Sequence, residues 1–491
     1  MFSWLFPLVV AQTTPPAIPI PVIPPPINAP PPPKAPTTPP EGIVSQEITV
    51  AQPVRPLPGS LDNIPVLNSN NPELIFNEGI IVSTLPSIGM GSPYAHLNFP
   101  FKGRFDVFAH HVVQASPQGR TLYLGILFFN SNRQPVTIDV LQGSAYLTSE
   151  ALFLDLPPVV ENPEGRVYAG PGSRSMDDIL RGKRPTDLPA RFTLAPGEST
   201  MLLNQPLPVN YQPVPGQPPP LSLPRNGFSA YYRLNSSGGV YGASMAMYAP
   251  LDNQGNERPP TLDEWVNLLK TSNLMGPRDR IPRNTQRRIY SRVAGVSQGS
   301  VWQSTLTDNG SNTLKIPETG QAYSYAISTL EGGRLGTGQK QSAKMLERYP
   351  DTAYEAHGNY GVQYSLTLPL VNQTRQSQRI GIAIETPLKQ DQTNGQLRFL
   401  TPPAKNVFFR GTVQIRYTDD RGQAQNRYFH LVQRRGQQGE PLITLTLPPG
   451  DRRTVQVDLG YPADSTPPQL ITVKNLGDQS LRPLGPLRPL P

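Results

Sequence analysis

The sequence predicts a mainly β protein: two antiparallel, immunoglobulin-like β-sandwich domains with a mixed, partly helical middle segment between them. Three observations lead to this fold class. Short apolar stretches with a period of two residues recur along the chain, as in strands with one buried face. Glycine, proline and asparagine separate these stretches at the short intervals typical of sandwiches. Two motifs also occur twice in the same order, which indicates a duplicated domain.

The duplicated motifs are a polar corner and, downstream of it, a Pro-Gly turn. The corner spans 130–134 in the first copy and 372–376 in the second, and both copies begin with asparagine. The turn spans 195–198 and 448–451, where proline presets φ and glycine accepts the positive φ of a type II turn. We therefore expect the two domains to share an architecture. The residues expected to correspond are Asn130 with Asn372, and Gly197 with Gly450.

The composition limits the classes of protein and of site. With 491 residues, the chain is too long for one ordinary core, so several domains are expected. It has no cysteine, which excludes disulfides, thiolate metal sites and a cysteine nucleophile. The net charge of +8 indicates a weak preference for acidic partners such as anionic glycans or lipid head groups, although an ordinary basic surface gives the same value.

Residues 1–11 are predicted to be a signal peptide. The apolar run 2–11 ends in small residues at Ala11, which suits cleavage there, and the run is too short to cross a bilayer. No other run approaches transmembrane length, so we expect an exported protein, in the periplasm or at the cell surface, with no transmembrane span. Because basic residues are missing before the run, a cytoplasmic protein with an apolar tip is the alternative.

Residues 12–56 are predicted to be a proline-rich, disordered spacer. Proline is so frequent between 13 and 40 that neither a helix nor a sheet can form, and polyproline II is favoured. Such a semi-rigid segment holds a folded part away from another structure. The alternative is that it serves as a ligand for proline-binding domains.

The first β-sandwich domain is predicted at 57–255. It contains a short helix, for which Ser175 is the expected N-cap and Gly182 the expected end. Residues 228–248 are predicted to form a hairpin that turns at 236–239. The strongest strands are expected at 99–113, 121–129 and 136–140.

The middle segment is predicted at 256–353. A capping box at 261–264 begins a helix whose apolar face includes Trp265. An arginine-rich stretch follows this helix, and polar, strand-like sequence follows the arginines. The remaining parts expected along the chain are the second β-sandwich domain at 354–475 and a flexible tail at 476–491.

Four stretches of the chain resemble a known family. They are LPGSLDNIPV at 57–66, HLNFPFKGRFDVFAHH at 96–111, YAGPGSRS at 168–175 and RVAGVS at 292–297. Together they make the chain from residue 57 to about 473 similar to a cyanobacterial family of exported proteins catalogued only as a domain of unknown function. The resemblance implies a cyanobacterial host and a place in the cell envelope. It implies no activity, so no catalytic residue is carried over.

A histidine-containing strand is a candidate metal site. Asp106 and His110 share one face of this strand, because side chains an even number of residues apart point the same way. With His96 nearby in the sequence, the three side chains would form a metal-binding set. The alternative is that the histidines are structural and hydrogen-bonded in the core.

Two basic features are candidates for contact with anions or partners. The sequence 170–175 precedes the predicted helix, where backbone amides and Arg174 would hold an anion, unless it is only the turn that begins the helix. In the arginine-rich stretch, Arg283, Arg287 and Arg288 are expected to contact acidic polymer, unless the stretch is a solvated basic loop. Aromatic residues do not alternate with these arginines, so no nucleic-acid partner is expected.

The sequence does not favour an enzyme. A serine hydrolase needs a nucleophile elbow of the G-x-S-x-G type, and we identify none in the sequence. A glycosidase needs two facing carboxylates, and nothing in the sequence sets such a pair apart. We therefore expect no catalytic residue and no cofactor. We interpret the chain as an exported cell-envelope protein of structural, adhesion or glycan-contact type. Its expected partner is envelope polysaccharide or another envelope protein. Two alternatives remain open: an envelope carbohydrate-active enzyme and a periplasmic metal or ligand carrier.

Overall fold

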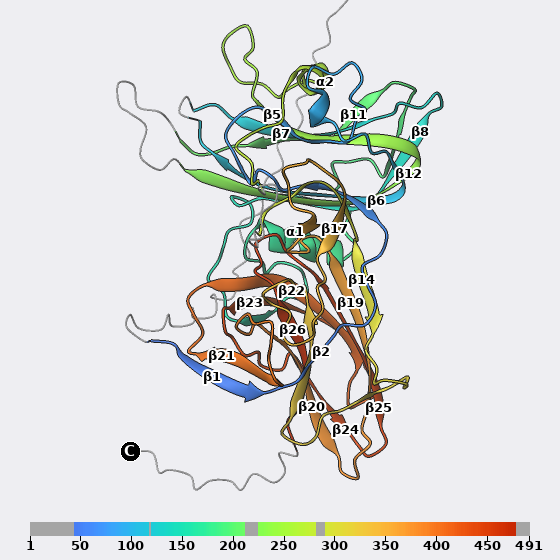
Figure 1. Ribbon diagram of the computed structural model, residues 1–491, viewed down its shortest axis with the longest axis vertical. Coiled ribbons are helices and arrows are strands. Elements are labelled where there is room, and N and C mark those ends of the chain that lie inside the picture. The colour runs from blue at the N-terminus through green and yellow to red at the C-terminus, as the bar shows by residue number, and fades with distance from the viewer. Residues whose placement is uncertain (1–43, 117–118, 212–223, 281–289, 478–491) are drawn as a thin grey trace, which may run out of the picture. The chain divides into compact units, whose positions relative to one another are not determined.

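The computed structural model describes residues 44–116, 119–211, 224–280 and 290–477 (Figure 1). The protein is mainly β, with 47% strand and 6% helix, so the predicted fold class is confirmed at that level. Its sheets are open and do not close on themselves. The predicted signal peptide, 1–11, lies outside the described residues, as does nearly all of the predicted tail, 476–491.

A 12-stranded sheet forms what we call the N-terminal body. Its strands are β3 (Pro65–Ser69), β4 (Leu74–Ile75), β5 (Gly79–Ser83), β6 (Phe101–Gln114), β7 (Leu122–Phe129), β8 (Val136–Leu147), β10 (Arg191–Leu194), β11 (Ser199–Leu207), β12 (Arg225–Tyr248), β13 (Ala294–Gln298), β17 (Ala343–Arg348) and β18 (Glu355–Ala356). Two layers arise because residues 225–236 of β12 pair with β6 and β8, whereas residues 241–248 pair with β7. Apolar side chains of both layers form the core, as where Phe105 meets Phe128 edge-on at 5.5 Å.

Strand β12 corrects the predicted hairpin at 228–248. The chain does not reverse at its Ser-Ser-Gly-Gly sequence but continues as one strand, with a shift of register between Ser236 and Val240 (Figure 1). Gly238 lies at this shift, and a Cβ there would come within 2.7 Å of the Val136 side chain. Glycine therefore serves here to bend a strand between two layers, where each half finds its own hydrogen-bonding partners.

A seven-stranded and a five-stranded sheet form what we call the C-terminal body. The seven strands are β9 (Val159–Glu161), β14 (Val301–Thr305), β15 (Leu314–Lys315), β19 (Gln363–Val371), β22 (Val407–Thr418), β23 (Ala424–Arg434) and β25 (Arg452–Gly460). The five are β2 (Val54–Arg55), β16 (Ala322–Ile327), β20 (Gln378–Glu385), β24 (Ile443–Leu447) and β26 (Gln469–Asn475). A single apolar core includes side chains of both sheets, among them Leu366, Ile382 and Val457.

The two bodies are not consecutive stretches of chain. Strand β9, from inside the predicted first domain at 57–255, pairs with β23 of the C-terminal body. The predicted middle segment, 256–353, contributes β13 and β17 to the N-terminal body and β14, β15 and β16 to the C-terminal body. The sheets are also mixed, whereas we predict antiparallel sheets: β3 runs parallel to β6, and β14 runs parallel to β19. Strands contributed by distant segments cover sheet edges that would otherwise be exposed.

The structure contains an additional strand inside the predicted spacer, 12–56. Strand β1 (Gln46–Ala51) pairs with β21 (Gln396–Thr401) as a two-stranded sheet. Ile48 and Val50 pack against an apolar cluster, and Gln52 is buried and donates a 2.6 Å hydrogen bond to Glu385. Proline is sparse after Pro40, and the alternating apolar residues that replace it suit a strand.

Helix α2 (Leu262–Thr271) begins as the sequence predicts. The Thr261 side chain accepts a hydrogen bond from the Glu264 amide, and the Glu264 carboxylate accepts one from the Thr261 amide, which completes the capping box. Trp265 is fully buried on the apolar face. The one short 3-10 helix in the described part of the chain, η1 (Pro93–Ala95), precedes β6.

Helix α1 (Pro171–Leu180) begins earlier than predicted, so Ser175 is not its N-cap. Pro171 occupies the first helical turn, where its fixed φ suits the helix and its missing N–H is not needed. Gly170 stands at the cap with a φ of 94°, a conformation that favours glycine. Gly182, the expected end, follows the helix with a φ of 72° and donates to the Ile179 carbonyl.

The duplicated corner makes the same hydrogen bonds in both copies, which confirms that Asn130 corresponds to Asn372. Each asparagine donates through Nδ2 to three backbone carbonyls. Gly197 and Gly450, with φ of 74° and 78°, donate to the asparagine carbonyls at 2.9 and 2.8 Å. The strand pairs also match: β7 with β11 and β8 with β10 in one copy, β19 with β25 and β20 with β24 in the other. A duplicated architecture therefore underlies the two bodies.

Two buried histidines make the stability of the protein sensitive to mild acid. His111 lies between the Ser69 hydroxyl and the Pro72 carbonyl, each at 2.9 Å, and burial lowers its pKa to about 4. Burial likewise lowers the pKa of His430 to about 4. Both side chains are neutral when folded and have a pKa near 6.5 when unfolded. Their contribution to stability is therefore complete above pH 6.5, the pKa of the unfolded state, and is lost as the pH falls towards 4, the pKa of the folded state.

We expect the free energy of unfolding to fall by about 2 kcal/mol for each of these histidines between pH 7 and about pH 5. Urea unfolding at the two pH values measures the loss. A His111→Phe variant should show a pH dependence weaker by about that amount. An unchanged pH dependence in this variant would show that His111 is protonated equally easily in the folded and unfolded chain.

Candidate functional site

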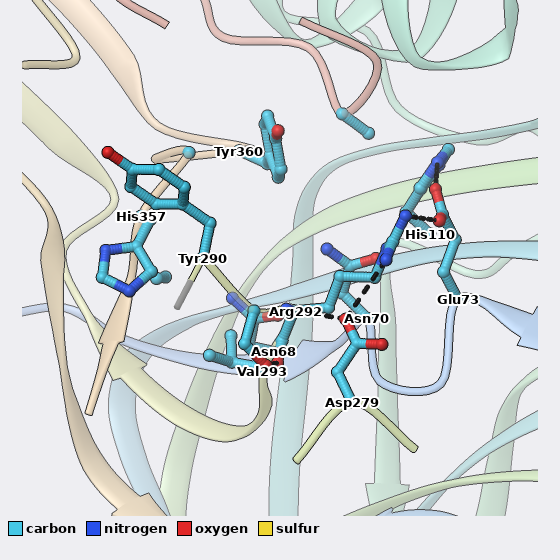
Figure 2. A pocket seen from close by; sticks show the side chains of 14 residues that line it. Asn68, Asn70, Glu73, His110, Asp279, Tyr290, Arg292, Val293, His357 and Tyr360 are labelled. Atoms are coloured by element: carbon cyan, nitrogen blue, oxygen red, sulfur yellow. Dashed lines mark hydrogen bonds and ion pairs between the residues drawn. The ribbon is translucent and has the colours of Figure 1, made fainter. Parts of the chain in front are cut away.

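A polar cavity of about 270 Å³ lies beside the N-terminal end of β13. Figure 2 shows its side chains: Tyr290 and His357 lie on one side, Glu73 and His110 on the other, and Arg292 between them. Strands β3 and β6 run parallel and bring Asn68 and His110 to the cavity from the N-terminal body. The segment after β18 contributes His357 and Tyr360, and the segment before β13 contributes Asp279, Tyr290 and Arg292.

The charged side chains of the cavity are arranged around Arg292, which lies between two carboxylates. One guanidinium nitrogen of Arg292 pairs with Glu73, and another lies 3.1 Å from Asp279. His110 places Nε2 3.4 Å from Glu73, while its Nδ1 contacts the Ser229 hydroxyl at 2.8 Å. Burial alone would raise the pKa of Glu73, but the hydrogen bond from His110 and the charge of Arg292 outweigh burial and lower this pKa. Glu73 is therefore ionised at neutral pH.

Two amides of the cavity have unused acceptors. Asn68 and Asn70 are each only 4% exposed, and neither side-chain oxygen has a hydrogen-bond partner in the described part of the protein. The Asn68 amide nitrogen instead reaches the Ser297 hydroxyl at 3.4 Å. A buried amide oxygen without a partner costs free energy, so these two positions favour a ligand that donates hydrogen bonds.

Aromatic side chains provide the apolar part of the cavity. Tyr290 is 49% exposed and meets the His357 ring edge-on at 5.6 Å. Tyr360 donates from its hydroxyl to the Ser465 carbonyl at 2.9 Å and stacks on Tyr461. Burial lowers the pKa of His357, so this side chain is neutral at pH 7. The cavity thus combines hydrogen-bond acceptors, an internally neutralised cation and an accessible aromatic ring.

The structure does not bring the three predicted metal ligands together. His96 bonds the Ser83 hydroxyl at 2.8 Å through Nδ1, and Asp106 accepts from Arg104, Tyr231 and Ser300. Of the three, His110 alone lines the cavity. No group of three histidine, aspartate or glutamate side chains suited to a metal occurs within the described ranges. Asp106 and His110 do share a strand face, but partners on β12 occupy both.

Of the arginines predicted to contact anions, the structure describes only Arg174, and its guanidinium packs on aromatic side chains of the protein. The Arg174 guanidinium stacks on Tyr146 at 3.8 Å and on Tyr168 at 4.5 Å, and it donates to the Glu150 carbonyl. It therefore helps to hold the start of α1 in place. Arg283, Arg287 and Arg288 lie outside the described residues, so their role in binding acidic polymer stays a prediction.

The statement that the sequence contains no G-x-S-x-G pattern is wrong, because this pattern occurs at 295–299. In hydrolases this pattern forms a sharp turn from a strand into a helix, with the serine exposed. Here Ser297 lies within β13, is 3% exposed and accepts a hydrogen bond from Asn68. The next element is strand β14, so the serine is not placed as a nucleophile.

Sequence reasoning also missed most of the cavity. Glu73, Asp279, Arg292 and His357 are far apart in the chain, and no spacing indicates that they meet. The sequence Asn68-Ser69-Asn70-Asn71-Pro72 looks like an ordinary turn. One weak signal was present, because Arg292 begins a stretch that carries the family resemblance.

The family profile "Protein of unknown function (DUF3370)" matches residues 52–475. The chain belongs to this family. The match covers both bodies and every residue that lines the cavity of the DUF3370 chain. No curated protein matches the sequence. No helix in the described part is long and apolar enough to cross a membrane.

Two solved structures resemble the DUF3370 chain only weakly. Lac15 from a marine microbial metagenome is 12% identical with a TM-score of 0.10, and the match covers 78% of this chain and 55% of Lac15. The chain thus spans about half the length of Lac15. The coconut allergen cocosin is 10% identical with a TM-score of 0.08, and the match covers 78% of this chain and 84% of cocosin.

Proposed function

We propose that this protein is an exported cell-envelope protein that contacts glycan, and that the cavity around Arg292 is its contact site. The observation that carries the proposal is the pair of buried, unpartnered amide oxygens of Asn68 and Asn70 in a cavity with an exposed tyrosine. Sugar hydroxyls donate hydrogen bonds to such oxygens, and the C–H face of a sugar ring packs on an aromatic side chain. Tyr290 is the ring available for that contact.

The charges of the cavity favour a neutral sugar. Arg292 is shared between the carboxylates of Glu73 and Asp279, so it offers little free positive charge to an anionic ligand. The two carboxylates themselves accept hydrogen bonds and repel anions. A neutral glycan, rich in hydroxyl donors, suits both features.

Binding suits the cavity better than glycoside hydrolysis, the enzymatic alternative. A glycosidase needs one carboxyl that stays protonated and donates to the leaving oxygen. Glu73 has a lowered pKa and is ionised. Burial raises the pKa of Asp464, but both of its carboxylate oxygens are buried and it does not line the cavity. Nor do His96, Asp106 and His110 form the ligand set that a metal carrier would need.

Export to the periplasm or cell surface is part of the proposal. It rests on the apolar run at 2–11 and its small-residue end at Ala11. Mass spectrometry of the protein from its native host should find a mature chain that begins at Gln12. A mature pool that retains Met1 would contradict export by this route.

Calorimetric titration with neutral hexasaccharides, such as cellohexaose, xylohexaose and mannohexaose, tests the contact site. We expect one-to-one binding of at least one of them, weakened about tenfold by Tyr290→Ala and about fivefold by Asn70→Ala. Tyr354→Ala is the matched control, because Tyr354 is 69% exposed and does not line the cavity. No binding in this panel, or binding that both cavity variants leave unchanged, would contradict the proposal.

A further inference from the structure

A second cavity, of about 360 Å³, has Lys344 of β17 in its wall. Its walls come from three segments, 59–63, 298–302 and 339–344. The volume lies within the range of roughly 300–1,000 Å³ that is typical of small-molecule sites. Glu355 contacts a residue of each cavity: it pairs with Lys340 of the second at 2.7 Å and lies 4.0 Å from His357 of the first.

The second cavity has the opposite charge character from the first. Lys340 and Lys344 line it, and no acidic residue is among the described residues of its lining. Glu355, which lies opposite Lys344 in the β17–β18 pair, partly neutralises Lys340. Lys344 is exposed and has no acidic side chain within ion-pair distance in the described part of the chain. An anionic group that enters the cavity would therefore meet one free ammonium and one shared ammonium.

The other groups of the wall are either already bonded or suited to a sugar. Gln339 bonds both backbone groups of Leu57 and is thus occupied. The Ser342 hydroxyl is buried and has no partner. The Trp302 indole N–H is taken by the Pro58 carbonyl at 2.8 Å, and the ring is only 4% exposed and stacks on Tyr364, so Trp302 belongs to the core and leaves no ring face open to a ligand. A free ammonium and a free hydroxyl are groups that bind the carboxylate and a hydroxyl of a carboxylated sugar.

We infer that this cavity binds the carboxylate of a uronic acid. The carboxylate pairs with Lys344 and Lys340, and a ring hydroxyl bonds Ser342. A phosphate ligand fits less well, because phosphate sites use arginine forks or the amides of a helix N-terminus, and no arginine or helical residue lines this cavity. The site is separate from the cavity around Arg292 and does not depend on the role proposed for that cavity.

Glucuronate and glucose are the probes, because they differ only at the carboxylate carbon. In calorimetry at low salt we expect glucuronate to bind about tenfold more tightly than glucose, as expected for two lysine contacts to one carboxylate. Lys344→Gln should abolish this difference, whereas Lys344→Arg should retain most of it. About 1 M salt should also remove it, because the lysines are exposed. Lys270→Gln, on the exposed face of α2, is the matched control and should change nothing.

Two results would overturn the inference: equal affinity for glucuronate and glucose, or a preference for glucuronate that survives Lys344→Gln. Asn70→Ala separates the two cavities, because it removes an acceptor from the first and touches nothing in the second. The preference for glucuronate should be unchanged in this variant. Its loss there would place glucuronate in the first cavity and would also overturn the inference.

Discussion

Replacing Glu385 by alanine lowers the free energy of unfolding by about 4 kcal/mol, because it leaves a largely buried ammonium group without its carboxylate partner. Glu385 is fully buried and accepts from Lys474 at 2.7 Å, from Thr472 at 2.8 Å and from Gln52 at 2.6 Å. The Lys474 side chain is only 19% exposed, so water replaces little of the lost interaction. Chemical unfolding of the wild type and the variant measures the loss.

Glu47→Ala is the matched control for this substitution. Glu47 also pairs with a cation, Arg398 at 3.3 Å, but both side chains are nearly half exposed. Exposed ion pairs contribute about 0–1 kcal/mol, so this variant should be nearly as stable as the wild type. Equal destabilisation by the two substitutions would show that burial does not determine the contribution of Glu385.

Asn372→Ala should destabilise the protein by about 3 kcal/mol, and Asn130→Ala by a similar amount. Each substitution leaves three backbone carbonyls without their side-chain donor. Asn130 belongs to the N-terminal body and Asn372 to the C-terminal body, and they share no partner. The double variant should therefore lose the sum of the two effects within about 0.5 kcal/mol. A marked difference between the single variants would contradict the equivalence of the two corners.

The fold could be predicted where local chemistry determines it. The duplicated corners at Asn130 and Asn372, the capping box at Thr261 and the strands with period-two alternation depend on neighbours in the sequence, and the structure confirms them. The errors concern long-range pairing. The Ser-Ser-Gly-Gly sequence after Asn235 is typical of a hairpin turn. In the structure it is a bend within β12, because the strand pairs with β6 before the bend and with β7 after it. No sequence pattern predicts the pairing of β9 with β23 either.

The candidate sites were less predictable than the fold, for the same reason. His110 was singled out, but its neighbours Glu73 and Ser229 were not. Parallel pairing of β4 with β6 brings Glu73 to His110, and antiparallel pairing of β6 with β12 brings Ser229. The amide oxygens of Asn68 and Asn70 become candidate ligand contacts only because the structure shows that they have no hydrogen-bond partner among the described residues. The lysines of the second cavity resemble any exposed lysine in the sequence.

The two cavities, one around Arg292 and one beside Lys344, would suit a heteropolysaccharide with neutral and acidic sugars. The cavity around Arg292 has its cation neutralised internally, whereas the cavity beside Trp302 has a free ammonium at Lys344. Glu355 contacts Lys340 of one cavity and lies 4.0 Å from His357 of the other. Each cavity can be disabled separately, by Asn70→Ala and by Lys344→Gln, so the two contributions are separable by experiment.

A crystal structure of the protein with the most tightly bound neutral hexasaccharide is the most direct test of glycan contact at Arg292. We expect a sugar ring in this cavity, with hydroxyls hydrogen-bonded to Asn68 and Asn70 and one ring face on Tyr290. A sugar bound at another surface, with the cavity filled by water alone, would contradict the proposed function.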